Sequence, residues 1–319
     1  MPAPSASESA SPSPSATAAP APPALTTAPL TGELVPLGST AHPSLAAKID
    51  NHVGARPQVG LQDADLVFEE LVEGGLTRYV AVWHSEIPAE IGPIRSIRPM
   101  DPDIVSPLGG IIAYSGGQQR FVALMRGTNV YNAIHGQSDT EPFMYRTRDK
   151  QAPHNVIVRA QDLVAVHADL AAPPQLFRFA TSVKWSSAAR FGVRASALQL
   201  TLGGSSHPSW TWDGGRRLWL RAQDGSPDLD SAGGQLSAVN VVVLRVPVST
   251  GLGVPKTELI GSGEAWIATG GRVVHASWSK ADRVSPIRLV DDSGQMISLA
   301  RGNSWIELVP LSGSVQQVP

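Results

Sequence analysis

The sequence predicts an α/β (α+β) N-terminal domain with a mixed sheet, followed by a mostly β C-terminal domain. Two observations support this prediction. In the first part of the chain, short apolar runs alternate with segments of helical spacing. Beyond residue 180, short strands and turn residues follow one another, and seven of the eight tryptophans occur there. With 319 residues and 42% hydrophobic content, the chain can bury a large core, and no internal repeat is present.

Residues 1–29 consist almost entirely of Ser, Ala, Pro and Thr. Such a segment has too little apolar surface to offset the entropy of ordering, so we expect a disordered tether. It is either a terminus without a role or a spacer between a folded module and a membrane or cell wall. No basic start with an apolar run is present, so an export signal or lipid-bearing cysteine would have to precede this chain. We expect the N-terminal domain over 30–172 and the C-terminal domain over 173–319.

Composition excludes several classes of function. The formal net charge of -2 argues against general nucleic-acid binding, which requires a basic surface. The chain has no cysteine, which excludes disulfides, thiolate catalysis and cysteine-bound metals. The histidines are scattered singly, without an H-E-x-x-H pattern, and no G-x-S-x-G occurs. We therefore expect no metal and no cofactor, and neither a zinc protease nor a typical serine hydrolase is indicated.

The first predicted strands deliver polar residues to their ends. A short strand over 46–49 leads to Asp50, Asn51 and His52. The runs 66–73 and 76–83 flank Gly74-Gly75 and predict a hairpin. A two-residue turn would place Leu71 opposite Arg78, with Glu69, Glu73 and Arg78 on one face. This face is either a cross-strand salt bridge or part of a functional site.

The segment 86–99 predicts a rigid loop that presents two guanidinium groups. Pro88, Pro93 and Pro99 forbid a regular helix and hold Arg95 and Arg98 on a stiff frame. Arginine pairs with carboxylates or phosphates through two parallel hydrogen bonds. The loop therefore indicates either anion binding or an internal ion-pair network.

The rest of the first half alternates strands and helices. We expect helices over 100–106, 118–126 and 160–170, and strands over 110–114, 129–132 and 156–158. Ser115-Gly116-Gly117 would lie at a strand-to-helix turn, where glycines serve backbone geometry or free amides hold an anion. In the second half the clearest strands are 210–212, 218–220, 239–246, 264–269, 273–278, 287–290 and 304–309.

Several segments resemble the DUF3048 family of bacterial envelope proteins. In the first half they are IDNH (49–52), ARPQ (55–58), EGGLTR (73–78), SEIP (85–88), IGPIRS (91–96) and APHN (152–155). In the second half they are NVVV (240–243), GEAW (263–266), WSK (278–280) and NSWIELVP (303–310). The family is named for an unknown function. The resemblance implies an α/β domain before a β-rich one, and an extracytoplasmic protein that is membrane-anchored or secreted.

These observations favour a cell-envelope binding or regulatory module with a polar pocket for a wall-derived or mixed-charge ligand. The candidate ligand-binding residues are Asp50, Asn51, Arg56, Glu73, Arg78, Glu86, Arg95, Ser96, Arg98, His154 and Asn155. The expected partner is a cell-wall component or an envelope protein, and no nucleic acid. One alternative is a hydrolase acting on envelope carbohydrate or peptide, with catalytic candidates Asp50, Glu73 and His154. Another is a protein-interaction scaffold that docks partners through its tryptophan-bearing β domain.

Overall fold

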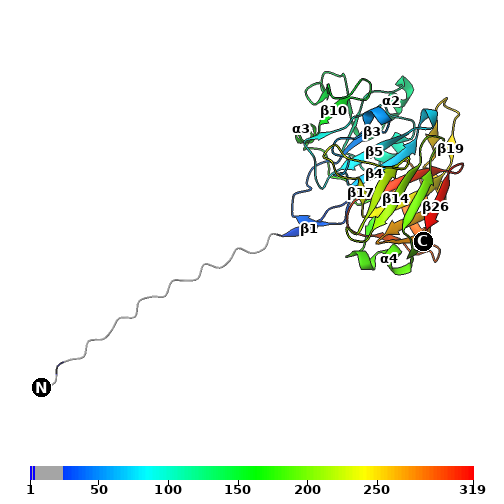
Figure 1. The fold of residues 1–319 in the computed structure, drawn as a ribbon. Coiled ribbons are helices and arrows are strands. Elements are labelled where there is room, and N and C mark those ends of the chain that lie inside the picture. The colour runs from blue at the N-terminus through cyan, green and yellow to red at the C-terminus, as the bar shows by residue number, and fades with distance from the viewer. Residues whose placement is uncertain (2, 4–23) are drawn as a thin grey trace.

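The computed structural model describes Met1, Ala3 and residues 24–319 of the chain. Most of the predicted tether therefore lies outside the described residues. Its last part does not fit the prediction, because β1 (Leu25–Thr27) pairs with β2 (Leu34–Pro36), and Ala28 is buried. The fold thus begins at least five residues before the expected boundary. Figure 1 shows the body of the protein as stacked sheets with few helices.

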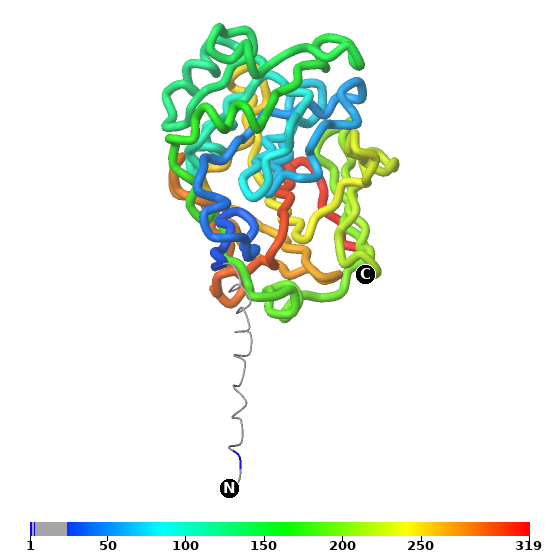
Figure 2. Tube along the Cα trace, turned by 90° about the vertical axis from the view of Figure 1, so that its left-hand side faces the viewer, coloured from blue at the N-terminus to red at the C-terminus, as the bar shows by residue number. Residues whose placement is uncertain are grey.

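The largest sheet has eleven strands and runs through both halves of the chain. In spatial order the strands are β12 (Val193–Arg194), β22 (Arg272–Lys280), β21 (Gly261–Thr269), β18 (Asn240–Val246), β25 (Ser304–Pro310), β4 (Leu66–Leu71), β5 (Thr77–Trp83), β3 (Leu45–Asp50), β7 (Ile111–Tyr114) and β8 (Tyr131–Ile134), with β23 (Arg288–Asp291) beside β22. The halves join where β25 pairs in parallel with β4, and Ser304 lies opposite Leu66. Figure 2 shows a red C-terminal segment next to blue and cyan N-terminal segments in the middle of the body. The sheet is mixed, as predicted for the first domain.

A second sheet covers one face of the large sheet. Its strands are β16 (Ser226–Pro227), β15 (Leu218–Gln223), β14 (Pro208–Asp213), β13 (Ala197–Thr201) and β26 (Ser314–Val318), with β17 (Ser237–Ala238) beside β15. Trp210 and Trp219 from this layer share one apolar core with Tyr79 and Trp305 of the large sheet. Since aromatic side chains bury large apolar areas, the tryptophans are mainly core residues, as their placement on strands predicts.

The opposite face of the large sheet packs against short helices and loops. Phe68, Val80 and Ile306 from the sheet share a second core with Phe121 and Met125 of a helix. The helices are α1 (Asp101–Val105), α2 (Gln119–Arg126), α3 (Ala160–Ala165) and α4 (Ser187–Phe191), with single turns η1 (Val53–Ala55), η2 (Glu73–Gly75) and η3 (Val183–Trp185). The remaining strands form small sheets: β6 (Glu90–Ile91), β10 (Val156–Arg159) and β9 (Met144–Arg146); β11 (Arg178–Phe179) and β24 (Ser298–Leu299); and β19 (Val248–Ser249) and β20 (Lys256–Thr257).

The protein is therefore mostly β, and the α/β description fits the first half only loosely. The expected helices all exist, but α1, α2 and α3 have only 5, 8 and 6 residues. The predicted helix over 160–170 ends early, at Ala165. Short apolar segments have the same periodicity whether they form one or two helical turns or belong to a longer helix. The mostly β second half agrees with the prediction.

The predicted hairpin exists, but its register differs by one residue. Leu71 lies opposite Thr77, and Glu70 lies opposite Arg78. The reason is the turn, in which three residues form η2, and Gly74 and Gly75 have φ of 70° and 72°. A one-residue shift moves every side chain to the other face of a strand. The expectation that Glu69 shares a face with Arg78 is therefore wrong.

Candidate functional site

The loop that contains Arg95 and Arg98 is fixed by backbone hydrogen bonds. Arg95 N donates to Lys48 O at 2.7 Å, and Ile97 N donates to Gly116 O at 3.0 Å. Ser115 N donates to Arg95 O at 3.0 Å. The loop is thus held between the ends of β3 and β7. The Ser115 amide is consequently not available to hold an anion, which removes part of the turn site considered from the sequence.

Asp50 lies at the centre of the polar cluster. It is the last residue of β3 and is almost fully buried. Its Oδ2 atom lies 2.6 Å from His154 Nδ1 and 3.2 Å from Arg95 Nε. Its Oδ1 atom accepts a hydrogen bond from His52 N at 3.1 Å. One carboxylate therefore links the end of β3, the arginine loop and the segment before β10.

His154 is oriented from two sides. Its Nδ1 is engaged with Asp50, and its ring stacks on the His52 ring with centroids 4.2 Å apart and planes 11° apart. No hydrogen bond from His154 Nε2 to any described residue is present, and the side chain is partly exposed. One ring nitrogen of His154 is thus fixed, and the other is available.

Two further arginines, Arg78 on the neighbouring strand and Arg98 on the same loop, extend the cluster around Asp50. Arg98 Nε donates to Glu73 Oε2 at 2.7 Å, and Arg78 Nη1 donates to Ser96 O at 2.6 Å. Burial, followed by repulsion from Arg98, lowers the pKa of Arg78 to about 10. Partial burial acts to raise the pKa of Glu73, but the hydrogen bonds that its carboxylate accepts and the charges of Arg98 and Arg78 together outweigh burial, and the net pKa shift is downward.

Positive charge exceeds negative charge in this cluster. Three guanidinium groups face two carboxylates, those of Asp50 and Glu73. Arg95 Nε is buried at ion-pair distance from Asp50 but is not aligned for a hydrogen bond, and its side chain is 23% exposed. Within the part of the chain that the structure describes, the Arg95 guanidinium donates no hydrogen bond. Its Nε is buried beside Asp50, but its two Nη groups are not buried and are therefore available to an added acceptor.

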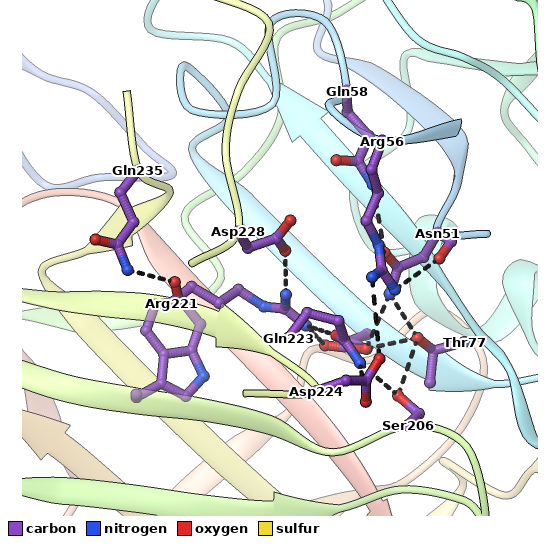
Figure 3. A network of polar contacts seen from close by, with 12 residues as sticks. Asn51, Arg56, Gln58, Thr77, Ser206, Arg221, Gln223, Asp224, Asp228 and Gln235 are labelled. Atoms are coloured by element: carbon purple, nitrogen blue, oxygen red, sulfur yellow. Dashed lines mark hydrogen bonds and ion pairs between the residues drawn. The ribbon is translucent and has the colours of Figure 1, made fainter. Parts of the chain in front are cut away.

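Asn51 and Arg56 belong to a different network, on the other side of the sheet (Figure 3). Arg56 Nε donates to Asn51 Oδ1 at 2.9 Å, and Asn51 Nδ2 donates to Thr77 Oγ1 at 2.8 Å. Thr77 Oγ1 in turn donates to Glu69 Oε1 at 2.6 Å. Because successive residues of a strand face opposite sides, Asp50 and its neighbour Asn51 serve separate clusters.

Arg221 is the centre of this second network, and the sequence prediction did not include it. It is fully buried and donates to Glu69 Oε2 at 2.5 Å and to Asp228 Oδ2. Its guanidinium carbon lies 5.0 Å from the Trp305 ring centroid and 5.4 Å from that of Tyr79. Trp219 and Arg221 are two residues apart on β15, so both side chains point inward. This spacing is the sequence signal that indicates a buried arginine.

Three predicted residues lie away from Asp50 or contribute only backbone. Glu86 is exposed and lies beyond the other end of β5. Burial raises the pKa of Asp63, and the charge of Glu86 raises it further. Asn155 Oδ1 accepts from Arg146 Nη1 at 2.7 Å and supports β9. Ser96 takes part through its carbonyl, which accepts from Arg78. These residues were expected from sequence proximity, but strand direction and local turns point their side chains elsewhere.

Beneath the arginine loop lies a fully buried ion triad. Lys48 Nζ contacts Glu70 Oε1 and lies 2.8 Å from Asp101 Oδ1. Asp101 Oδ2 accepts a hydrogen bond from Arg98 N at 2.6 Å. Burial, followed by repulsion from Asp101, raises the pKa of Glu70 to about 8. The triad therefore ties the loop to β3 and β4 and contains a carboxyl that holds a proton near neutrality.

One cavity of the protein lies away from the polar cluster. That cavity, of about 460 Å³, lies in the second half and is lined by Phe191, Trp266, His275 and Asp292 among others. The Asp50 cluster is the candidate site, because it combines a buried carboxylate with partly exposed charged and polar side chains. Among the described residues, no group of histidines and acids has the arrangement of a metal site. None of the helices in residues 24–319 has the length and apolarity needed to span a bilayer.

Comparison with known proteins gives the family. The model described as "Protein of unknown function (DUF3048) N-terminal domain" matches residues 30–172, and that of the C-terminal domain matches residues 198–306. "Putative lipoprotein YerB" of Bacillus subtilis (strain 168) is 25% identical over 296 residues, covering 89% of this chain and 86% of that protein. The crystal structure of YerB from Bacillus subtilis has the same fold, with a TM-score of 0.77 at 22% identity over 91% of this chain and 99% of that one. The chain belongs to the DUF3048 family.

Proposed function

We propose that this protein is an extracytoplasmic module of the cell envelope that binds an anionic or mixed-charge ligand at the Asp50 cluster. Its similarity to a protein named as a lipoprotein supports the location. We further propose that a lipid anchor or an export signal precedes the tether. The ligand would be a wall-derived molecule that bears carboxylate or phosphate groups.

The state of Arg95 is the observation that most supports ligand binding. Its guanidinium is partly exposed, lies beside a buried carboxylate and donates no hydrogen bond to the described residues. A planar guanidinium favours a carboxylate or phosphate oxygen pair. Arg78 and Arg98 add positive charge within the same cluster. An anionic group beside Arg95 would satisfy its donors and relieve this repulsion.

His154 supports a ligand that has neutral hydrogen-bonding groups beside its acid, rather than a bare anion. His154 presents Nε2 next to Arg95 through their shared partner Asp50. A neutral imidazole donates or accepts one hydrogen bond at that nitrogen. Hydroxyl or amide groups adjacent to an acid, as in wall peptides and amino sugars, would match this arrangement.

Titration calorimetry with soluble muropeptides tests this proposal. A hydrogen bond to a charged group contributes about 1.5–3 kcal/mol, so Arg95→Ala should weaken binding roughly 10- to 150-fold. Arg120→Ala is a matched control, because Arg120 is an exposed arginine on α2. Equal affinities for the native protein and the Arg95→Ala variant would refute a binding role for Arg95.

The Asp50–His154 pair supports a second candidate, a hydrolase acting on envelope peptide or carbohydrate. A histidine whose Nδ1 is held by a buried carboxylate can act as a general base through Nε2. Glu73 is less suited to this role, because its ion pair with Arg98 lowers its pKa. Incubation with peptidoglycan and mass spectrometry of the products test the candidate. New products that persist with His154→Gln would exclude His154 as the base.

A further inference from the structure

One end of the molecule exposes large apolar side chains from neighbouring turns. Trp185 and Phe191 are each 54% exposed, and Val183 and Val193 are also exposed. They come from η3, from α4 and from the start of β12. We call these four residues, together with Lys184 and Arg190, the α4 face. Soluble proteins rarely gather such residues without an interaction partner.

The α4 face is positively charged as well as aromatic. Lys184 Nζ lies 5.6 Å from the centroid of the Trp185 ring, and the Arg190 guanidinium carbon lies 4.6 Å from that of Phe191. The sequence has no Asp or Glu between Asp169 and Asp213. This charge is complementary to an anionic surface.

Acidic side chains do occur beside the α4 face, in the cavity that Phe191 and Val193 also line. Asp291 accepts hydrogen bonds from the turn that follows it, including one from Ser293 Oγ at 2.6 Å. Asp292 Oδ1 lies 2.7 Å from His275 Nδ1. Both carboxylates thus have local partners, and they lie on a different element from the cations of α4.

The α4 face lies at the end of the fold where the chain enters from its N-terminal segment. Figure 1 shows α4 and β1 at one end, with α2 and β10 at the other, and Figure 2 agrees. Contacts support this view: Ser298 N of β24 donates to Ser187 Oγ of α4 at 2.9 Å. The paired strand β11 ends at Phe179, which packs in one core with Leu30. An anchor before β1 would therefore attach the folded body at this end.

We propose that the α4 face rests on an anionic phospholipid surface, with Trp185 and Phe191 at headgroup depth and Lys184 and Arg190 against lipid phosphates. Tryptophan and basic side chains are the residues that favour this interface. The inference rests on the proposed envelope location. It also has a consequence for orientation: β10, which the segment with His154 precedes, would lie on the side facing away from the membrane.

Flotation with vesicles tests the proposal on the full chain without a lipid anchor. Vesicles of phosphatidylglycerol and phosphatidylcholine should bind the protein at low salt, and pure phosphatidylcholine should bind it weakly. Each basic residue near an anionic surface strengthens membrane binding, so K184E/R190E should reduce vesicle binding by about tenfold or more. R120E/R126E on α2 makes the same charge change at the opposite end and should retain binding. Trp185→Ala should also reduce binding.

Three results would overturn the proposal. The first is no binding to anionic vesicles at low salt. The second is equal loss in K184E/R190E and R120E/R126E, which would indicate a nonspecific charge effect. The third is that the native protein and Trp185→Ala bind soluble polyphosphate equally while neither binds vesicles. This result would indicate that the α4 face binds an anionic polymer instead of a membrane. The Arg95→Ala variant separates the two proposals, because it should lose muropeptide binding and keep vesicle binding.

Discussion

Replacing Arg221 by methionine should strongly destabilise the protein, because two buried carboxylates would lose their cation. Arg221 donates to Glu69 from the first half of the chain and to Asp228 from the second. All three side chains are essentially inaccessible to solvent. Burial, followed by the charge of Glu69, raises the pKa of Glu307 well above its usual value, which favours the neutral form of this nearby third acid. The unpaired charges would therefore be those of Glu69 and Asp228.

Removing one partner of a buried ion pair costs about 3–5 kcal/mol in free energy of unfolding. We expect Arg221→Met to fall in this range. Methionine keeps the apolar part of the side chain but lacks the guanidinium group, whose carbon lies 5.0–6.0 Å from the ring centroids of Tyr79, Trp210 and Trp305. A variant that also neutralises the two carboxylates separates the effect of charge from that of the space left behind.

Guanidinium chloride unfolding followed by tryptophan fluorescence measures the effect. A triple variant, Arg221→Met with Glu69→Gln and Asp228→Asn, removes the stranded charges and should recover part of the loss. A loss of less than about 1 kcal/mol in Arg221→Met would refute the reasoning, since it falls well below the cost of an uncompensated buried charge. A triple variant less stable than the single one would also contradict it.

Two further predictions concern pH and backbone. Glu70 has its pKa raised to about 8 by burial and then by Asp101, so folding takes up a proton and stability should fall as pH rises from 4.5 to 8. Between pH 6.5 and 8, above the pKa values of Asp65 and His84, Glu70 should contribute at most about 1.4 kcal/mol per pH unit to the slope of stability measured by urea unfolding, beside the contribution of Glu307; Glu70→Gln should reduce the slope by this amount, and an unchanged slope would argue against a protonated Glu70. At Gly32, where φ is +70° and an added Cβ would lie 2.3 Å from Phe179 Cγ, alanine should cost about 2–5 kcal/mol. Gly38→Ala has a similar positive φ and nothing within 4 Å, so an equal loss of melting temperature in both variants would exclude the Phe179 contact as the cause.

The sequence predicted many of the local elements. Its strand and helix patterns located the hairpin of β4 and β5, the helices α1 and α2, and the β-rich second half. Proline and hydrogen-bonding residues in 86–99 indicated a stiff loop with two arginines, and this loop lies where Asp50 and His154 converge. These features depend on residues that are close in sequence, so propensity and periodicity are sufficient to predict them.

The pairing of distant segments required the tertiary structure. A three-residue turn at η2 shifted the hairpin register by one and placed Glu69 and Arg78 on opposite faces, which no alternation pattern reveals without the turn geometry. The parallel pairing of β25 with β4 makes one sheet of both halves, and the packing of the second sheet on it brings Arg221 to Glu69, 152 residues away. The sequence alone determined which polar residues were available and how they were spaced. Only the fold decided which of them share a face, because strand register and long-range pairing depend on side chains from the whole chain packing together.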